Sequence, residues 1–547
     1  MAVVQFEKKH LERMIGRKLT DSDYKERIPL FGCPLEKLDA ANVHFEVSPN
    51  RPDMFSIEGF ARAIRSFLSG KPKLTKYKVS KGKIQLKIDS SVQQVRPYVT
   101  CAVVRRVKIT DDLISSLMQV QEKLHDTLGR KRKKVAIGIH DLKRVTPPFT
   151  YKAVGPDSIR FLPLDMKKEM TLREILKKHP KGIEYANVIE SARKWPIIVD
   201  RKNRVLSFPP IINGELTRVT EKTKDLFIDV TGTDERAINQ ALNILATSFA
   251  DRGCKIESVR LALTASKKTY TPNLDSWKMK VDANYVNKIL GLDLDKIKIK
   301  KLLEKMDVGF DGRSAIIPAY RADVMHPIDI AEDVAIAYGY DRFTPTVPPV
   351  ATNALPLEKN DYYYTVKQLM TGLGLQEVVC LTLSNVEDEF DKMNAPRQPV
   401  AETLNAVTPE CNICRRDILP SLMDVLAHNQ HQEYPQKIFE VGDVIVLDIK
   451  EETGAKNVKK LACAIADTKV SYAQISSVLS SFMENLGVRY ELQPVEHPSF
   501  IEGRVANVIV KSKVVGIIGE IQPKALNNWK LEMPVATLEI DLDALRV

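Results

Sequence analysis

The spacing of hydrophobic side chains predicts a strand, a turn and a helix in the first part of the chain. The run His44–Val47 is typical of a strand, and a proline-containing turn follows it. Beyond the turn, apolar residues recur every three or four positions from Ile57 to Phe67, the spacing of one buried helix face. Asp53 and Ser56 are both suitable N-cap residues for that helix. A lysine-rich stretch comes next and is expected to be an exposed linker, so the first domain is predicted to end near residue 82.

The middle of the chain alternates strand and helix patterns. Residues 83–268 combine β-branched runs with helical periodicity. Strands are predicted at Val99–Val104, Val135–Ile139, Pro196–Val199 and Phe227–Val230, and helices at Asp112–Leu128 and Glu235–Asp251. Residues 269–345 are predicted to form a smaller domain, with strands at Lys278–Val281 and Ala315–Ala319 and helices at Asn284–Leu290 and Asp295–Met306.

The last part of the chain has a different order of elements. Helices are predicted at Asp361–Leu373 and Asp417–His428, and strands at Glu377–Leu383, Lys437–Val446, Leu461–Ala466, Val505–Ile509, Val514–Ile518 and Val535–Ile540. The last three strands are consecutive, which favours an antiparallel sheet with helices packed on it.

Length and composition bound the class of protein. The chain has 547 residues, of which 44% are hydrophobic and 28% charged, the balance of a soluble globular protein. At roughly 100–200 residues per domain, this length predicts three to five domains. No stretch approaches 18 uncharged apolar residues, so a membrane span is not expected. The beginning of the chain has no apolar signal segment, and a cytoplasmic location is expected.

Charge is distributed unevenly along the chain. Residues 346–547 hold 19 Lys+Arg and 27 Asp+Glu, a net charge of −8, whereas residues 1–345 carry a net charge of +20. Such asymmetry is a sign of nucleic-acid contact, although it also serves solubility. Within the basic part, the run Arg130–Lys134 is interpreted either as a solvated cluster at the start of a strand or as a phosphate contact.

The seven scattered cysteines indicate a reducing compartment. Cys411 and Cys414 form a single CxxC pair, and zinc would need two further ligands, for which His428 and His431 are candidates. The apolar run Ile418–Leu422 favours a buried helix there instead. Phosphate-binding glycine motifs and the class I synthetase signatures are absent from the sequence.

The sharpest chemical feature is a group of acidic residues on a helix predicted to begin near Pro327. On that helix Asp329, Glu332 and Asp333 are spaced i, i+3, i+4, which places the three carboxylates on one face. Asp323 lies just upstream, where it can fold over the same face.

Four converging carboxylates repel one another unless a cation lies among them. Mg²⁺ suits such a group because it takes carboxylate and water oxygens as ligands. Two simpler interpretations stay open. Acidic side chains in the first turn favourably oppose the helix dipole, and Arg321 or Arg342 can neutralise the cluster.

Two stretches, Ser48–Arg62 and Tyr320–Phe343, together resemble the β subunit of phenylalanyl-tRNA synthetase of the archaeal and eukaryotic cytosolic type. Further agreement follows in family order at Lys134–Leu142, Leu206–Gly214, Asp229–Asp234, Lys437–Val444 and His497–Pro523. The matches run from near residue 10 to the end of the chain, an order that coincidence does not explain.

The resemblance implies a multidomain α+β protein of four parts. Residues 1–82 are an N-terminal domain that meets the α subunit or tRNA, and residues 83–268 are a central α/β editing domain. Residues 269–345 are a small helical domain that holds a metal on the acidic cluster. Residues 346–547 are a catalytically silent class II synthetase-like domain, an antiparallel sheet with flanking helices.

The same resemblance implies partners and a cofactor. The chain is expected to pair with an α subunit, which takes ATP and phenylalanine and charges tRNA(Phe), in an α2β2 heterotetramer. The family places Mg²⁺ on the acidic cluster, and Asp323, Asp329, Glu332 and Asp333 occupy the matching positions.

An enzyme that charges tRNA with phenylalanine needs an editing site for a physical reason. A pocket built for a phenyl ring rejects tyrosine only weakly, by on the order of 10², because tyrosine merely adds a hydroxyl. The resemblance therefore places hydrolysis of mischarged Tyr-tRNA in the central domain. Asn213 and Gly214 follow a Pro-Pro turn, and their backbone amides are candidates to hold the ester carbonyl. Asp229 or Thr231 is the candidate to bind the tyrosine hydroxyl, and the simpler interpretation of these residues is a strand and a turn.

Two other classes of function remain open on the sequence alone. A paralogue that kept the fold but lost the assembly would be a non-catalytic scaffold for tRNA or DNA. The carboxylate cluster also suits a metal-dependent nuclease.

Overall fold

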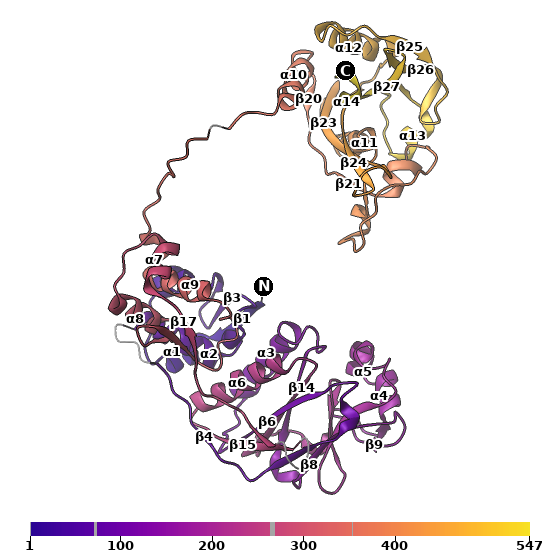
Figure 1. The fold of residues 1–547 in the computed structure, drawn as a ribbon. Coiled ribbons are helices and arrows are strands. Elements are labelled where there is room, and N and C mark those ends of the chain that lie inside the picture. The colour runs from indigo at the N-terminus through magenta and orange to yellow at the C-terminus, as the bar shows by residue number, and fades with distance from the viewer. Residues whose placement is uncertain (1, 70–73, 263–267, 353, 547) are drawn as a thin grey trace. The chain divides into compact units, whose positions relative to one another are not determined.

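A computed structural model describes residues 2–69, 74–262, 268–352 and 354–546 (Figure 1). Contacts divide the chain into two compact units, residues 1–347 and 348–547. The segment 344–352 is exposed and contains neither helix nor strand. Within the described residues, no helix is both long enough and apolar enough to cross a membrane.

The first unit begins with a three-stranded antiparallel sheet of order β1-β3-β2. Its strands are β1 (Ala2–Glu7), β2 (Leu35–Leu38) and β3 (Asn42–Val47), and its helices are α1 (Lys8–Ile15) and α2 (Ile57–Leu68). The predicted strand at 44–47 and the helix from residue 57 are confirmed. Ser56 caps α2, because its Oγ accepts a hydrogen bond from the Gly59 N–H, whereas Asp53 pairs with Arg51.

The predicted linker is only partly a linker. Lys76, Lys78, Lys81 and Lys83 are exposed as expected, while Lys71 and Lys73 lie outside the described residues. Residues 79–80, however, form β4 (Val79–Ser80), which pairs in parallel with β15 (Lys255–Ala262). The chain therefore joins the central sheet before residue 82.

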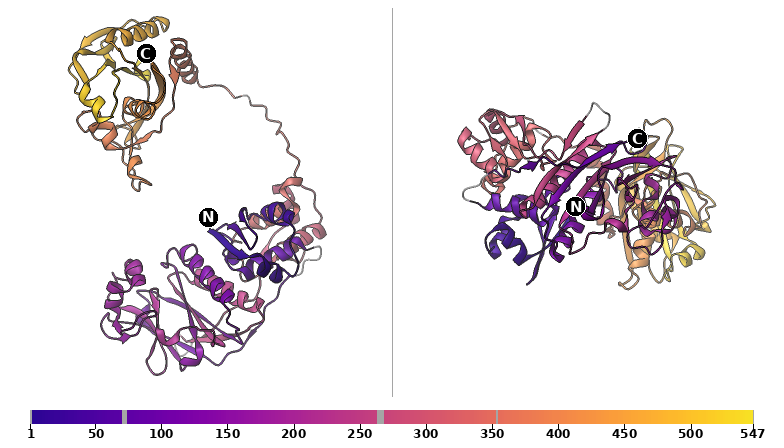
Figure 2. Two further views of the ribbon diagram at one scale, coloured as in Figure 1. Left: turned by 180° about the vertical axis from the view of Figure 1, so that it is seen from behind. Right: turned by 90° about the horizontal axis from the view of Figure 1, so that it is seen from below.

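An eleven-stranded sheet forms the centre of the first unit, in the order β13-β12-β11-β8-β5-β15-β6-β14-β7, with β4 and β16 also paired to β15. The remaining bounds are β5 (Gln85–Ile88), β6 (Tyr98–Arg105), β7 (Val135–Asp141), β8 (Phe149–Val154), β11 (Trp195–Val199), β12 (Val205–Phe208), β13 (Ile212–Asn213), β14 (Asp225–Gly232) and β16 (Lys268–Thr271). Helices α3 (Asp111–Asp126) and α6 (Glu235–Asp251) pack on one face of β6, β14 and β7 (Figures 1 and 2).

A smaller segment is inserted between β8 and β11. It consists of β9 (Arg160–Phe161), β10 (Met170–Thr171), α4 (Leu172–Lys178) and α5 (Pro180–Tyr185). A capping box begins α4, in which Thr171 and Glu174 satisfy each other's backbone N–H groups.

The part of the first unit expected to be helical also contains a sheet. Strands β17 (Trp277–Lys280), β18 (Gly309–Phe310) and β19 (Ser314–Ile317) pair in the order β17-β19-β18, and helices α7 (Ala283–Leu290), α8 (Lys296–Lys305) and α9 (Pro327–Tyr338) pack against them. The predicted strands at 278–281 and 315–319 belong to this sheet. A description of this part as a helical domain is therefore incomplete.

A buried arginine ties distant segments of the first unit together. Arg62 of α2 is 1% exposed and its Nη1 donates to Asp251 Oδ2 of α6 over 2.6 Å and to the Tyr77 hydroxyl over 2.9 Å. Its guanidinium also lies 3.7 Å from the centre of the Tyr320 ring. The Tyr320 hydroxyl in turn donates to Asp307. These contacts fix the N-terminal segment, the central sheet and the α7–α9 part in one unit.

The second unit is built on a seven-stranded sheet of order β20-β23-β24-β28-β27-β26-β25, antiparallel except for the pair β20–β23. Its strands are β20 (Gln376–Glu377), β23 (Gln436–Leu447), β24 (Ala455–Ala466), β25 (Glu491–Pro494), β26 (Phe500–Val510), β27 (Lys513–Ile521) and β28 (Val535–Asp541), and a separate pair is formed by β21 (Leu383–Ser384) and β22 (Ile413–Cys414). The expected antiparallel sheet with helices on it is confirmed.

Helices cover both faces of this sheet. Helices α10 (Glu358–Gly372), α12 (Tyr472–Asn485) and α14 (Leu542–Leu545) enclose one hydrophobic core, and α11 (Leu419–His428) and α13 (Pro523–Asn528) enclose another. The strand predicted at 377–383 is wrong in its middle, because residues 378–382 lie outside any strand. Val379 and Leu381 there are 84% and 71% exposed, so this run has no sheet to join.

Candidate editing pocket and acidic cluster

A cavity of about 150 Å³ lies beside the central sheet of the first unit. Strands β7, β12 and β14 and helix α3 contribute to its lining, and the Pro209–Pro210 turn, whose peptide is cis, borders it. Apolar side chains such as Phe208 and Ile211 make up part of the wall, and a few polar groups interrupt it. This combination of an apolar wall and sparse polar groups is typical of a site that orients one side chain of a ligand.

Asp229 borders the cavity and is held by a buried chain of hydrogen bonds. The Oδ1 atom of Asp229 lies 2.7 Å from His140 Nε2, and His140 Nδ1 lies 2.8 Å from the Thr217 hydroxyl. All three side chains are at most 2% exposed. The Thr217 hydroxyl also donates to the Gly214 carbonyl over 3.2 Å, so the chain of contacts is anchored on the backbone at its far end. The chain fixes the direction of the carboxylate.

Gly138 makes this arrangement possible. It pairs directly with Asp229 across β7 and β14. A Cβ atom at position 138 would lie 2.5 Å from Asp229 Oδ1 and 2.7 Å from His140 Nε2, closer than real Cβ contacts come. Only glycine therefore leaves room for the two side chains to meet.

Ser207 and Arg132 also border the cavity. Among the described residues, the Ser207 Oγ and Arg132 Nε atoms have no hydrogen-bond partner. The other end of Arg132 is well held, because Nη1 donates to the carbonyls of Pro210 and Ile211 over 3.0 and 2.9 Å and the guanidinium lies 4.2 Å from the centre of the Tyr185 ring. The Arg132 side chain thus belongs to the wall of the cavity rather than to a solvated charge cluster.

The four residues expected in the editing pocket fall into two pairs. Asn213 and Asp229 line the cavity. Gly214 does not, and its N–H donates to the Leu206 carbonyl over 2.7 Å, so this amide is already used. Thr231 is fully buried, and its hydroxyl accepts a hydrogen bond from Arg96 Nε over 2.9 Å. The sequence interpretation missed His140, Thr217 and Ser207, because only the pairing of the strands reveals where these residues lie.

The four acidic residues also separate into two pairs. Asp323 and Asp333 both bind the buried side chain of Arg321, whose Nη2 lies 2.6 Å from Asp323 Oδ2 and 3.0 Å from Asp333 Oδ2. Burial alone would raise the pKa of Asp323, but Arg321 lowers it to about 2. Burial raises the pKa of Asp333 to about 6 against the opposing charge of Arg321. Of the interpretations that the sequence left open, neutralisation by Arg321 describes this pair.

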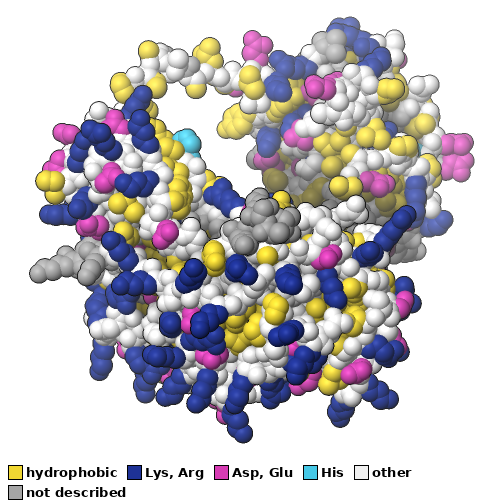
Figure 3. Space-filling model, turned by 60° about the horizontal axis from the view of Figure 1, so that its bottom comes forward, with side chains coloured by type: hydrophobic (Ala, Val, Ile, Leu, Met, Phe, Trp, Pro, Cys, Tyr) yellow, Lys and Arg dark blue, Asp and Glu magenta, His cyan; other side chains and the backbone are white. Residues whose placement is uncertain are grey.

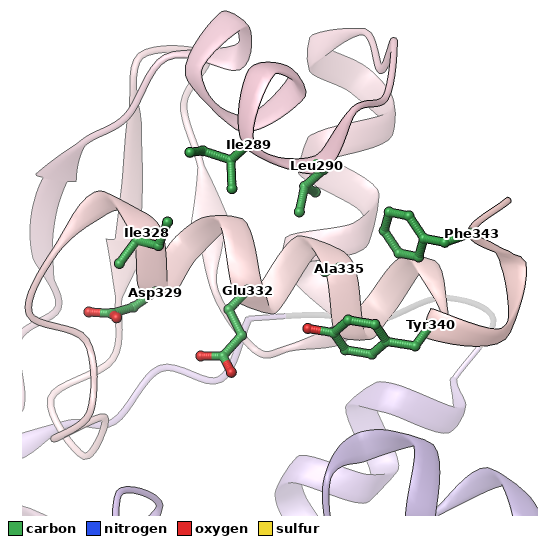
Figure 4. Close-up of a pocket in the computed structure, with 8 residues that line it drawn as sticks. All are labelled: Ile289, Leu290, Ile328, Asp329, Glu332, Ala335, Tyr340 and Phe343. Atoms are coloured by element: carbon green, nitrogen blue, oxygen red, sulfur yellow. The ribbon is translucent and has the colours of Figure 1, made fainter. Parts of the chain in front are cut away.

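The other two carboxylates border a cavity of about 470 Å³ (Figure 4). Asp329 Oδ2 accepts the backbone N–H groups of Met325 and His326 over 2.6 and 2.7 Å, and so caps α9. Glu332 is exposed. Figure 4 shows Asp329 and Glu332 extending from the same side of α9, with Tyr340 farther along the helix. The four carboxylates therefore do not converge on one point.

Within residues 2–69, 74–262, 268–352 and 354–546, no group of three or more His, Cys, Asp or Glu side chains is arranged to hold a metal ion. Cys411 and Cys414 therefore belong to no such group. Cys411 and Cys414 are half-buried free cysteines, and His428 is largely exposed and pairs with Asp424.

Proteins of known sequence resemble this chain over its whole length. A phenylalanine–tRNA ligase beta subunit of Archaeoglobus fulgidus is 43% identical over 100% of this chain and 98% of the relative. The chain belongs to the family of phenylalanine–tRNA ligase β subunits. A β subunit of Methanocaldococcus jannaschii is 41% identical over 99% of this chain and 100% of the relative. A β subunit of Pyrococcus abyssi is 41% identical over 98% of each.

Three domain families match this β-subunit chain in order. Residues 92–268 match the B3/4 domain, residues 279–340 match the tRNA synthetase B5 domain, and residues 344–542 match the phenylalanyl tRNA synthetase beta chain CLM domain. The cavity beside Asp229 therefore lies in the B3/4 match, and the acidic residues of α9 lie in the B5 match.

A solved structure agrees with the first unit of the β-subunit chain. The N-terminal fragment of the phenylalanyl-tRNA synthetase beta subunit from Pyrococcus horikoshii is 39% identical, covers 62% of this chain and 99% of that fragment, and has a TM-score of 0.59.

Proposed function

We propose that this chain is the β subunit of a heterotetrameric phenylalanine–tRNA ligase, in which an α subunit binds ATP and phenylalanine and charges tRNA(Phe). Similarity to β subunits along the whole chain is the observation that carries this proposal.

Reconstitution tests this assignment. The chain alone is expected to charge no tRNA, and the chain mixed with its α subunit is expected to attach phenylalanine to tRNA(Phe) with consumption of ATP. Nucleic-acid binding without any association with α would favour a scaffold instead. Cleavage of tRNA by the chain and Mg²⁺ alone would favour a nuclease.

The proposed division into domains is 1–82, 83–268, 269–345 and 346–547. The ranges matched by the three domain families support the last three of these ranges to within about ten residues at each end. The net charge of +20 on residues 1–345 supports contact between tRNA and the first three domains. Figure 3 shows lysine and arginine side chains spread over one face of the first unit, which suits a phosphate backbone.

The central domain is proposed to hydrolyse Tyr-tRNA in the cavity beside Asp229. The carboxylate of Asp229, fixed by His140, accepts a hydrogen bond from the tyrosine hydroxyl. A site built to bind a hydroxyl leaves its own polar group unpaired when phenylalanine enters, and this difference gives strong selection for tyrosine. Asn213 and Ser207 supply polar groups for the ester of the bound Tyr-tRNA. Gly214 and Thr231 keep the lining residues of the cavity in position.

Substitutions in the cavity test this proposal. Asp229→Asn removes the negative charge but keeps the shape, and it is expected to slow hydrolysis of Tyr-tRNA by the αβ enzyme while charging with phenylalanine is unchanged. Asp225→Asn, at the half-buried start of the same strand and away from the cavity, is the matched control. If Asp229→Asn and Asn213→Ala both cleared Tyr-tRNA at the parent rate, the pocket would be misplaced.

Mg²⁺ is proposed to bind at Asp329 and Glu332. Proteins commonly hold Mg²⁺ through one or two carboxylates, with water completing the ligand shell. Asp329 Oδ1 is not used by the cap of α9, and Glu332 is exposed on the same side of the helix. Asp323 and Asp333 fit such a site less well, because Arg321 already neutralises them. Their proposed role is to fix the beginning of α9 rather than to ligate the ion.

Assembly in the presence of Mg²⁺ provides the test. Asp329→Asn is expected to weaken the dependence of αβ association on Mg²⁺ while the isolated chain keeps its fold. Glu304→Gln, on helix α8, is the matched control. An αβ complex in which Asp329→Asn changed neither assembly nor its Mg²⁺ dependence would remove the metal from this cluster.

A further inference from the structure

The second unit contains a cavity of about 510 Å³ that no step of charging or editing uses. It lies on the face of the sheet that carries α11, and the strands β24, β27 and β28 border it. The helical turn Glu387–Asp391 closes another side. A volume of this size falls within the range of roughly 300–1,000 Å³ that is usual for small-molecule sites.

A lysine and two acidic side chains form a satisfied network at one side of the cavity. Lys460 Nζ lies 2.8 Å from Glu539 Oε1 and 2.5 Å from Asp417 Oδ1. The second oxygen of Glu539 accepts the backbone N–H groups of Ile418 and Leu419 over 3.1 and 2.9 Å. Two acidic side chains share one cation here, so the ammonium group of Lys460 is already bound within the wall of the cavity.

Glu389 adds a carboxyl group that is only half satisfied. Its Oε1 accepts the backbone N–H groups of Arg416 and Asp417, each over 2.7 Å. Its Oε2 is buried and has no hydrogen-bond partner among the described residues, and the side chain lines the cavity. The residue is 2% exposed, so solvent does not replace the missing partner. Buried polar atoms are almost always hydrogen-bonded, and an oxygen without a partner in a side chain that lines a cavity therefore indicates a missing donor.

The rest of the wall combines apolar side chains with polar ones such as Gln398, His497 and Asn507. Phe390, Met393 and Phe500 line the cavity and are 3%, 4% and 5% exposed. Burial raises the pKa of Glu389 to about 8, and the charges of Asp417 and Glu539 act in the same direction. A cation beside Oε2 would lower the pKa of Glu389 again, because an opposite charge favours the ionised carboxylate.

We propose that this cavity binds a small organic ammonium compound with an aromatic or branched aliphatic body. The ammonium group donates to Glu389 Oε2, and the body lies among Phe390, Met393 and Phe500. An anion is disfavoured because Asp417 and Glu539 already bind the ammonium group of Lys460. The site is independent of the editing pocket and of charging by the α subunit, so its test does not depend on either.

Calorimetry with matched probes tests the proposal on the full chain without the α subunit. The probe is 2-phenylethylammonium, and 2-phenylethanol is its neutral isostere. The amine is expected to bind at millimolar concentration and more tightly than the alcohol. Glu389→Gln, which keeps an acceptor for the two backbone N–H groups, is expected to weaken amine binding roughly tenfold or more, because a hydrogen bond to a charged group is lost.

Glu387→Gln is the control variant, since Glu387 lies in the same helical turn but is exposed. It is expected to bind the amine as the parent does. Failure of the amine to bind the parent, equal binding of the alcohol, or undiminished binding by Glu389→Gln would each overturn the proposal. Thermal unfolding of Glu389→Gln checks that the variant is folded. Its melting temperature is expected to equal or exceed that of the parent, because the substitution removes a buried carboxyl group that is only half satisfied.

Discussion

Replacement of Gly138 by alanine tests how tightly the side chains around the proposed editing pocket are packed. The new Cβ atom would lie 2.5 Å from Asp229 Oδ1 and 2.7 Å from His140 Nε2. Neither neighbour can swing into solvent, because they are 1% and 0% exposed. Overpacking of a buried site costs about 1–3 kcal/mol, and loss of a hydrogen bond to a charged group costs about 1.5–3 kcal/mol. Since the two effects overlap, a loss of about 2–5 kcal/mol in the stability of the first unit is expected.

The functional consequence is expected to be selective. Displacement of Asp229 removes the proposed acceptor for the tyrosine hydroxyl, so Tyr-tRNA hydrolysis by the αβ enzyme should fall at least tenfold, with each tenfold corresponding to about 1.4 kcal/mol of transition-state stabilisation. Charging with phenylalanine should persist at temperatures where the first unit stays folded. Hydrolysis of Tyr-tRNA, charging and thermal unfolding are measured on the same preparation.

Gly155→Ala is the control for this experiment. A Cβ atom at position 155 meets nothing closer than Ser158 Cβ at 4.0 Å, so this variant should keep the parent stability and the parent hydrolysis rate. The reasoning is refuted if Gly138→Ala unfolds at the parent temperature and clears Tyr-tRNA at the parent rate. Equal losses in both glycine variants would show that a methyl group in this domain is disruptive in general, and the contact with Asp229 would then have no special role.

Two further predictions concern buried charges. Arg62→Met is expected to lower the unfolding free energy of the first unit by about 3–5 kcal/mol, because the half-buried Asp251 carboxylate loses its cation and keeps only the Tyr77 hydroxyl as a partner. Adding Asp251→Leu should restore part of this loss, and calorimetric unfolding of the single and double variants measures it. Glu389 has a folded pKa of about 8, raised by burial, and an unfolded value of about 4.3. The folded state therefore binds the Glu389 proton more tightly than the unfolded state does. The free energy of unfolding of the second unit is expected to decline as pH rises from about 5 to 8, because this proton is then lost. Urea unfolding should show a smaller decline in Glu389→Gln, whereas the titrations of Asp417 and Glu539 remain in both proteins.

Local patterns predicted helices and strands well where burial follows the period of the element. The helix predicted at 235–251 is α6 with the same bounds, because an aspartate caps it and its apolar residues recur at helical spacing. Strands such as β23 and β28 were also found by their apolar runs. The run at 377–383 has the same apolar composition but lies mostly outside the sheet. Composition alone does not decide whether a neighbouring strand is present to pair with.

The candidate site was predicted less completely, for a reason that lies in tertiary contacts. Asp229 and Thr231 are two positions apart on β14, so their side chains point to the same face of the strand. The sequence could not reveal that Arg96 would take the Thr231 hydroxyl and leave only Asp229 at the cavity. It also could not reveal that Arg321 would divide the acidic cluster, although this arginine was among the interpretations left open.

The contact between Arg62 and Asp251 has a consequence for synthesis of the chain on the ribosome. The two residues are 189 positions apart. At about 5–20 residues per second, Arg62 waits roughly 10–40 s for its partner to be made. During that time the face of α2 that will contact α6 has no α6 to cover it. The nascent N-terminal segment is thus exposed to chaperones, and to wrong partners, until the last helix of the central sheet has left the exit tunnel.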